Sequence, residues 1–232
     1  MVGDRDHRDR CVPGDLRVLI AGLTLLLRTL LLCAMMVVLA ACARPQKPNA
    51  SAEDIAAVSY RDPGPATLTL YTMINNNSGA GAHTSLMINA SERVIFDPAG
   101  SFQADIVPEV NDVLYGVTPA VERAYRSSHA RSTHHVVVQT LEVTPEQAQL
   151  AYDLARKAGP VPGAFCANST SQILRQIPGL EGISTTFYPT NLVAQFDEIP
   201  GVVSNAYYED DSGDLQVGLA QNNAALNQQA AN

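Results

Sequence analysis

The chain has 232 residues, of which 46 % are hydrophobic, and its formal net charge is −8 at pH 7. This length and apolar content predict one folded domain with its own core, together with extensions. The acidic balance argues against a protein that binds nucleic acid, or an anionic membrane surface, through a basic patch. We therefore expect no nucleic-acid partner.

The N-terminal segment 1–41 is predicted to be a targeting signal. An apolar stretch, TLLLCAMMVVLAA, covers residues 29–41, and the sequence Leu39-Ala40-Ala41-Cys42 ends it. This pattern resembles a bacterial lipoprotein signal, which is cleaved before an acylated cysteine. The resemblance implies that Cys42 is lipidated and attaches the chain to a membrane. An uncleaved transmembrane anchor is the alternative, and Arg28 argues against it because this charge interrupts the longer apolar run.

Lipidation would leave one free thiol in the mature chain. Cys11 and Cys33 would leave with the signal and Cys42 would be acylated, so only Cys166 would remain free. The signal implies a location in the bacterial cell envelope, facing the periplasm. Two residues after Cys42 the chain has Arg44 and not an aspartate, and resemblance to the sorting rules of enteric lipoproteins implies the outer membrane. An unpaired cysteine in an oxidising compartment is a liability unless it is buried or used, and this favours a chemical role for Cys166.

The rest of the chain is predicted to contain a tether, one domain and a tail. Residues 42–66 are rich in proline, alanine and polar residues, which is typical of a tether. The folded domain is expected over residues 67–208. Residues 209–232 are acidic and then rich in asparagine, glutamine and alanine, and we expect this tail to be disordered.

The first part of the domain is predicted to be a set of antiparallel strands. Alternating apolar residues indicate a strand over 67–74, and a glycine-rich loop, NNNSGAGA, follows it at 75–82. Strands over 83–89 and 93–97 are expected to form a hairpin. The turn sequence Asp97-Pro98-Ala99-Gly100 ends this hairpin.

The second part of the domain is predicted to alternate between helices and strands. Thr118 and Thr144 each precede a proline at a first helical position, and Gln147 completes a capping box. The expected elements are a helix over 117–127, a strand over 134–143, a helix over 145–157, a helix over 166–176, a helical turn over 190–195 and a strand over 202–208. Together these elements predict an α+β domain, an antiparallel sheet with packed helices.

The stretch FCANSTSQIL, residues 165–174, places Cys166 at the start of a helix. The positive end of a helix dipole favours a thiolate over a thiol. We expect Ser169, Thr170 and Ser171 to cap the free backbone N–H groups there. A cysteine hydrolase needs, in addition, an imidazole that holds the proton and a polar group that orients the imidazole.

A histidine at the start of a strand, a hairpin return, a long insertion and a cysteine at a helix start resemble the permuted papain-like hydrolases. These are circularly permuted relatives of the NlpC-type cell-wall peptidases and include the lecithin retinol acyltransferase group. The resemblance covers roughly residues 67–195. It implies that His83 is the base, Asp97 the orienting residue and Cys166 the nucleophile. Phe165 stands where many relatives have a tyrosine.

The same resemblance implies a circularly permuted papain-like fold and a thiol hydrolase. Its relatives act as peptidases or amidases on cell-wall peptide, or transfer acyl groups, and we expect no cofactor and no metal. Whether Asp97 can reach His83 depends on the hairpin, because side chains alternate along a strand. A three-residue turn would put both on one face, and a two-residue turn would separate them. Glu92 and Asn89 are nearer the tip and are poorer candidates.

A non-catalytic interpretation stays open. Cys166 could be a buried, inert thiol and His83 a polar residue at a strand start. The chain would then be an envelope lipoprotein that uses the same fold for binding.

Metal sites are weaker alternatives. His129, His134 and His135 lack a nearby acid and a recognised ligand spacing. The acidic residues Asp210, Asp211 and Asp214 could suggest calcium, but their loop lacks the EF-hand pattern.

Overall fold

The computed structural model describes residues 23, 25–30 and 48–231. Residues 23 and 25–30 are helical, and the rest of the predicted signal, with Cys11, Cys33 and the lipidation site Cys42, lies outside the described residues. Within the described part of the chain, no helix is both long enough and apolar enough to cross a membrane.

An antiparallel sheet of seven strands forms the centre of the domain, in the order β4-β5-β3-β2-β1-β6-β7. Its strands are β1 (Thr67–Asn75), β2 (Gly81–Asn89), β3 (Arg93–Phe96), β4 (Glu109–Val110), β5 (Val113–Leu114), β6 (His134–Glu142) and β7 (Val203–Tyr207). The five strands predicted from the sequence are confirmed. The sequence did not predict β4 and β5, because two residues are too few to show a periodic pattern.

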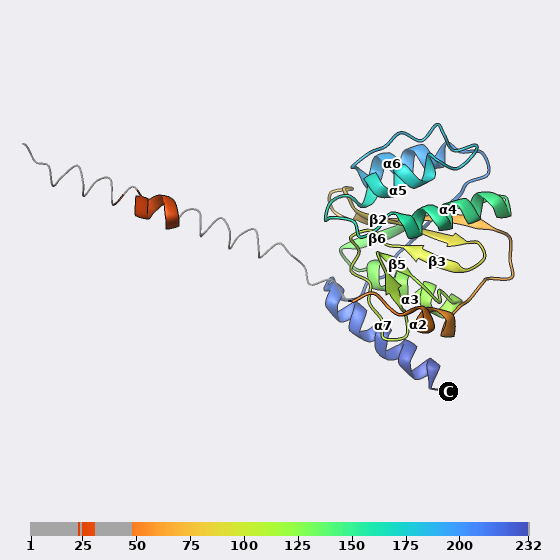
Figure 1. Cartoon of the computed structure of the whole chain (residues 1–232), viewed down its shortest axis with the longest axis horizontal. Helices are drawn as coiled ribbons and strands as arrows, with labels where there is room; N and C mark the ends of the chain where they lie inside the picture. The colour runs from red at the N-terminus through yellow and green to blue at the C-terminus, as the bar shows by residue number, and fades with distance from the viewer. Residues whose placement is uncertain (1–22, 24, 31–47, 232) are drawn as a thin grey trace, which may run out of the picture. The chain divides into compact units, whose positions relative to one another are not determined.

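Helices cover both faces of this sheet (Figure 1). They are α2 (Ala52–Ala57), α3 (Pro119–His129), α4 (Pro145–Lys157), α5 (Cys166–Leu174), α6 (Pro189–Asp197) and α7 (Leu215–Ala230). Thr118 and Thr144 cap α3 and α4 as predicted, by accepting the N–H groups of Val121 and Gln147. The α+β class with an antiparallel sheet is therefore confirmed.

Side-chain alternation along the strands supplies a core on each face of the sheet. Leu70 and Leu86 pack in the cluster that includes residues of α4, α5 and α6. Tyr71 and Met87 belong to the cluster that includes residues of α3 and α7. Because both faces are covered, the interior of β1 is buried along its whole length.

The predicted tether over 42–66 is in part folded onto the domain. Ser51 forms a capping box with Asp54 at the start of α2. Ile55 and Val58 pack against the core, and the N–H of Ala50 donates to the carbonyl oxygen of Glu109 at 2.9 Å. The compact unit therefore begins at Pro48, and composition alone overestimated the length of the linker.

The expectation of a disordered tail over 209–232 is corrected by α7. Asp214 caps this helix by accepting the N–H of Gln216 at 2.9 Å. Leu219 and Leu226 are buried against α3, two turns of helix apart. These two apolar contacts are too widely spaced to stand out in a polar composition, which explains the error.

Shortening one of these leucines tests whether α7 belongs to the folded domain. Leu226→Ala should lower the free energy of unfolding by about 2–5 kcal/mol, because the side chain is only 3 % exposed. Urea denaturation measures this difference. Val217→Ala on the same helix is the control, since Val217 is 39 % exposed. Equal and small effects of both substitutions would show that the tail does not pack.

Candidate active site

The three residues expected to form the site meet at one end of β2. His83 lies near the start of β2, Asp97 follows β3 and Cys166 begins α5. Asn89 pairs with Arg93, which leaves three residues in the hairpin turn, and Leu86 pairs with Phe96. This three-residue turn places Asp97 on the same face of the sheet as His83.

An unbroken series of hydrogen bonds joins the three side chains. His83 Nε2 lies 2.7 Å from Asp97 Oδ1, and the two side chains are 15 % and 3 % exposed. The His83 and Cys166 side chains also form a hydrogen bond. Since Nε2 is engaged by the carboxylate, Nδ1 is the ring nitrogen that remains for the sulfur.

Two backbone N–H groups also donate to the sulfur of Cys166, those of Thr84 and Ala167. The Thr84 N–H is free for this role because β3 ends opposite Leu86 and does not extend along the first residues of β2. The Ala167 N–H belongs to the first turn of α5, where N–H groups have no acceptor within the helix. Both donors stabilise a thiolate.

The expected capping of α5 by serine and threonine is wrong. No side chain caps its N-terminus, and the Ser171 hydroxyl instead donates to the carbonyl oxygen of Asn168 at 3.0 Å. The prediction failed because Phe165 occupies the N-cap position, so these three residues lie inside the helix, past the position from which a side chain can cap it. The N–H of Cys166 itself, at the first helical position, therefore stays available to bind an oxyanion.

Mutual contacts outweigh burial in setting the charges of the three side chains. Burial opposes protonation of His83, but attraction and hydrogen bonding to Asp97 raise its pKa to about 10. Burial raises the pKa of the Cys166 thiol, but the hydrogen bond and charge of His83 bring the pKa below its ordinary value. Burial likewise raises the pKa of Asp97, and the charge of His83 outweighs it and leaves the pKa low. The site favours a thiolate, an imidazolium and a carboxylate.

Tyr125 of α3 forms a second layer behind Asp97 that the sequence analysis missed. Its hydroxyl lies 2.7 Å from both Asp97 Oδ1 and Ser85 Oγ. Because the tyrosine has one proton and the carboxylate can only accept, Tyr125 donates to Asp97 and accepts from Ser85. This arrangement fixes the carboxylate that in turn orients His83.

His129 packs beside this second layer. Its ring lies 4.5 Å from the Tyr125 ring and 6.2 Å from the His83 ring, measured between centroids. Burial holds the pKa of His129 below its ordinary value, so this histidine is neutral and does not compete for Asp97. Tyr125 and His129 share the buried face of α3 with Val121 and Ala124. That helical spacing was the one available signal for both residues.

The turn Asp97-Pro98-Ala99-Gly100 holds the carboxylate in place. Ala99 has φ 57°, and the Gly100 N–H donates to the Asp97 carbonyl oxygen at 2.9 Å, which are features of a type II turn. A Cβ atom on Gly100 would lie 1.8 Å from Asp97 Oδ2. Glycine is therefore required here because the Asp97 side chain folds back over it.

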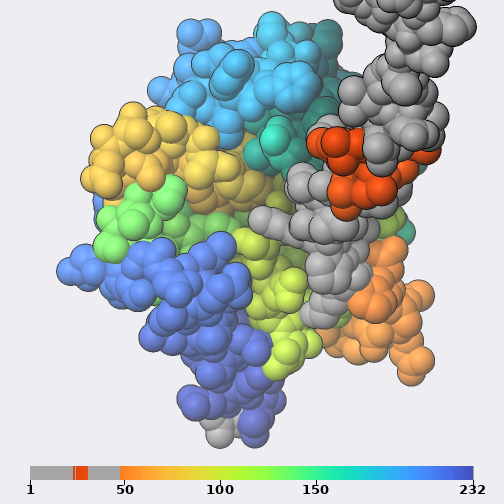
Figure 2. Space-filling view, turned by 90° about the vertical axis from the view of Figure 1, so that its left-hand side faces the viewer, coloured from red at the N-terminus to blue at the C-terminus, as the bar shows by residue number. Residues whose placement is uncertain are grey.

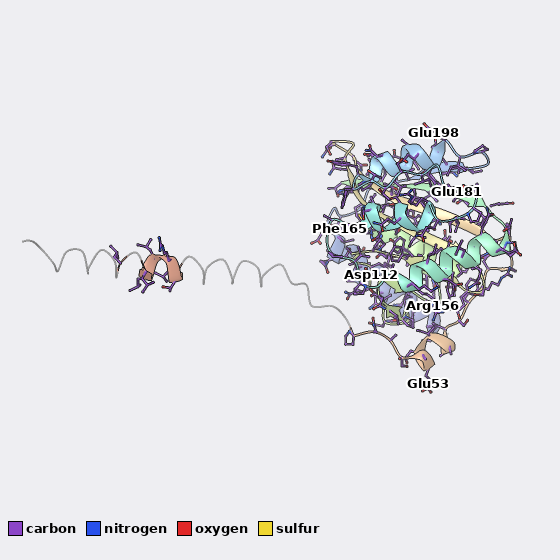
Figure 3. The ribbon with its side chains drawn as sticks, turned by 45° about the horizontal axis from the view of Figure 1, so that its top comes forward. Glu53, Asp112, Arg156, Phe165, Glu181 and Glu198 are labelled. Atoms are coloured by element: carbon purple, nitrogen blue, oxygen red, sulfur yellow. The ribbon has the colours of Figure 1, made fainter. Side chains whose placement is uncertain are left out.

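Asp112 ties this turn to the segment that leads into α5. Its Oδ2 atom accepts the N–H of Val161 at 2.7 Å and the N–H of Ala99 at 3.2 Å. Burial raises the pKa of Asp112 above its ordinary value. Figure 3 shows Asp112 and Phe165, the residue before Cys166, at the same end of the domain.

The metal alternatives gain no support from the side-chain contacts. His134 Nδ1 contacts Thr133 Oγ1 at 2.9 Å, and His135 Nδ1 contacts Asn76 Oδ1 at 2.7 Å. Asp211 pairs with Arg131 at 2.9 Å. Among residues 48–231, no three histidine, cysteine or acidic side chains group closely enough to hold a metal ion.

Removing the Tyr125 hydroxyl should weaken the site without dismantling it. In Tyr125→Phe, Asp97 loses one donor, its pKa rises and it holds the His83 proton less firmly. We expect roughly a tenfold loss of kcat/KM, the effect of one hydrogen bond to a charged group, worth about 1.5 kcal/mol. The lower pH limit of activity should rise with the pKa of Asp97, and the upper limit should fall with the pKa of His83. An unchanged pH profile would contradict this positioning role.

The arrangement combines the parts that acyl transfer needs: a thiolate, a proton donor next to it, a carboxylate that orients the donor, and backbone N–H groups at a helix start. Cys166 is the one cysteine among the described residues, and it is free. No family model, curated protein or solved structure compared with this chain matches it.

Proposed function

We propose that the protein is a thiol hydrolase that attacks an ester or amide carbonyl with Cys166. The observation that supports this most directly is the hydrogen-bonded series from Cys166 through His83 to Asp97. The order of these residues in the chain, and the packing of α5 against β2, agree with a circularly permuted papain-like fold, which we include in the proposal.

The reaction follows from the charges of the resting site. The Cys166 thiolate forms a bond to the carbonyl carbon, and the oxygen gains a negative charge that the Cys166 N–H can bind. His83 gives its Nδ1 proton to the leaving alcohol or amine as the carbon–oxygen or carbon–nitrogen bond breaks. Water then attacks the thioester, His83 takes a proton from this water, and the carboxylic acid and the thiolate are released.

We further propose that the protein works in the bacterial envelope, held by a lipid on Cys42 and facing the periplasm at the outer membrane. The sequence ending in Leu39-Ala40-Ala41-Cys42 supports this location. The compact unit begins at Pro48, six residues after Cys42. A lipid at that position would keep the domain close to a membrane surface.

Alkylation of Cys166 against pH separates the hydrolase from a non-catalytic binding protein. We expect iodoacetamide to label Cys166 well below pH 8.5, the pKa of a free cysteine, because the His83 charge lowers the thiol pKa. Mass spectrometry of the labelled peptide measures the rate, and Cys166→Ala is the blank. Labelling that follows an ordinary thiol, or stays absent in the folded protein, would favour the binding interpretation.

A further inference from the structure

Resting on the proposed hydrolase, we infer that its substrate presents an uncharged apolar acyl chain, bound by an aromatic rim beside Cys166. The rim consists of Phe165, Phe187 and Tyr188. It selects the acyl-chain class of substrate over cell-wall peptide.

Exposed aromatic side chains gather next to the nucleophile. Phe165 directly precedes Cys166 and is 41 % exposed, while Phe187 and Tyr188 are 52 % and 67 % exposed. The rings of Phe165 and Phe187 meet edge to face with centroids 5.1 Å apart. Exposed aromatic residues that cluster in this way mark a binding surface more often than isolated ones do.

Contacts on two sides fix the rim against the site. The N–H of Thr186 donates to the Ser171 hydroxyl of α5 at 3.2 Å. Gly81, two residues before His83, packs closely on Pro189, the residue after Tyr188. A Cβ atom added to Gly81 would lie only 2.7 Å from the Cβ of Pro189. Figure 2 views the molecule from this end, where the gold segment near residue 80 adjoins the light-blue segment near residue 190. The rim therefore borders both Cys166 and the strand of His83.

The stretches that carry His83, Cys166 and the rim have no charged side chains apart from His83. Residues 63–91, 158–174 and 182–196 contain no aspartate, glutamate, lysine or arginine, in a chain of net charge −8. Two carboxylates, those of Asp97 and Asp112, act electrostatically on His83, and both are buried. The rim itself therefore offers apolar and neutral polar contacts.

This distribution of charge separates the two substrate classes. Cell-wall peptides contain free carboxylates and amines, which proteins bind with charged partners in charge-assisted hydrogen bonds. These three stretches supply no such partner. An aliphatic chain needs none, and it gains from each methylene that it buries against the aromatic rings. Attack by Cys166 on such an ester forms the acyl thioester, and the alcohol leaves with the proton from His83.

A chain-length series measures this preference. Purified full-length protein is given the p-nitrophenyl esters of acetate, butyrate and octanoate, and release of p-nitrophenolate is followed after subtraction of the Cys166→Ala rate. Each rate is divided by the rate of N-acetylcysteine with the same ester. We expect kcat/KM to rise by about fourfold per added methylene from acetate to butyrate, and to remain higher for octanoate than for acetate.

The variant Phe187→Ala should reduce the butyrate-to-acetate ratio at least fivefold. Tyr208→Ala is the matched control, because Tyr208 is 62 % exposed and stacks on His135 outside the rim. A flat series with Cys166-dependent release of acetate, or a ratio that Phe187→Ala leaves unchanged, would overturn the acyl-chain inference and leave the hydrolase standing. No Cys166-dependent release from any ester, together with an ordinary thiol in the alkylation experiment, would overturn the hydrolase itself.

Discussion

Replacing His83 with glutamine should lower kcat/KM by about 10²–10⁴-fold, the usual contribution of a positioned proton donor. Glutamine keeps a polar side chain at the start of β2, but it has no charge to stabilise the thiolate and no proton to give the leaving group. The alkylation midpoint of Cys166 should therefore move up towards the free-cysteine value of about 8.5. The acyl-transfer rate of the wild type should fall above about pH 10, where His83 loses its proton.

A second histidine provides the control for this substitution. His135→Gln changes an imidazole on β6 that contacts Asn76 and stacks on Tyr208, and it should leave both the rate and the alkylation midpoint unchanged. If His83→Gln behaves in the same way as His135→Gln, then His83 is a structural residue and the proposed chemistry is wrong.

Protein stability gives a readout of the same residue that needs no substrate. The folded state keeps a proton on His83 up to about pH 10, whereas the unfolded chain releases it near 6.5. The Cys166 thiol of the unfolded chain keeps its own proton up to about pH 8.5, whereas the folded site holds a thiolate. The folded imidazolium–thiolate pair and the unfolded pair therefore bind equal numbers of protons between about pH 6.5 and 8.5. From about pH 8.5 to 10 the folded state binds more, and the free energy of unfolding should fall as pH rises through this window. In His83→Gln this slope should disappear.

The resemblance to permuted papain-like hydrolases singled out His83, Asp97 and Cys166, and the structure brings these three side chains together. The residues that support them were not predicted. Tyr125 could not be assigned, because its contact with Asp97 depends on how α3 packs across the sheet. Helical spacing can place Tyr125 on the buried face of α3, but a single sequence does not show which residue it meets across the sheet.

Long periodic elements were predicted more accurately than short or sparsely apolar ones. The strand β1 and the helix α4 were found because alternation, a proline and a capping box agree along them. The two-residue strands β4 and β5 lack any such pattern. The helix α7 was missed because its buried leucines, Leu219 and Leu226, are widely spaced in a polar composition.

Gly100 shows how a turn residue can control the chemistry of the site. The turn sequence alone predicted only the end of a hairpin, since the need for glycine follows from where the Asp97 carboxylate lies. In Gly100→Ala the new methyl group would overlap Asp97 Oδ2 and Cγ, at 1.8 and 2.1 Å. Both distances are shorter than any real contact of a Cβ atom, so the carboxylate must move away from His83 Nε2.

We expect Gly100→Ala to lower kcat/KM by about 10²-fold, the usual cost of displacing a catalytic group by about 1 Å. The His83 pKa should fall, because the charge and hydrogen bond of Asp97 are what raise it. The pH at which acyl transfer declines should then lie below its wild-type value of about 10. Gly182→Ala is the control, since a Cβ there would have no neighbour within 4 Å.

A double-mutant cycle identifies the cause of the Gly100→Ala effect. If the methyl group acts only by displacing Asp97, then Gly100→Ala should lower kcat/KM much less in the Asp97→Asn variant than the loss of about 10²-fold that is expected in the wild type. The reason is that the orienting carboxylate is already absent from that variant. Additive losses would mean that Gly100→Ala damages the site by another route, such as distortion of the segment that Asp112 holds against the turn. Thermal unfolding of all three variants measures whether lower stability contributes to the loss of activity. An unchanged Tm would assign the loss to the displaced carboxylate.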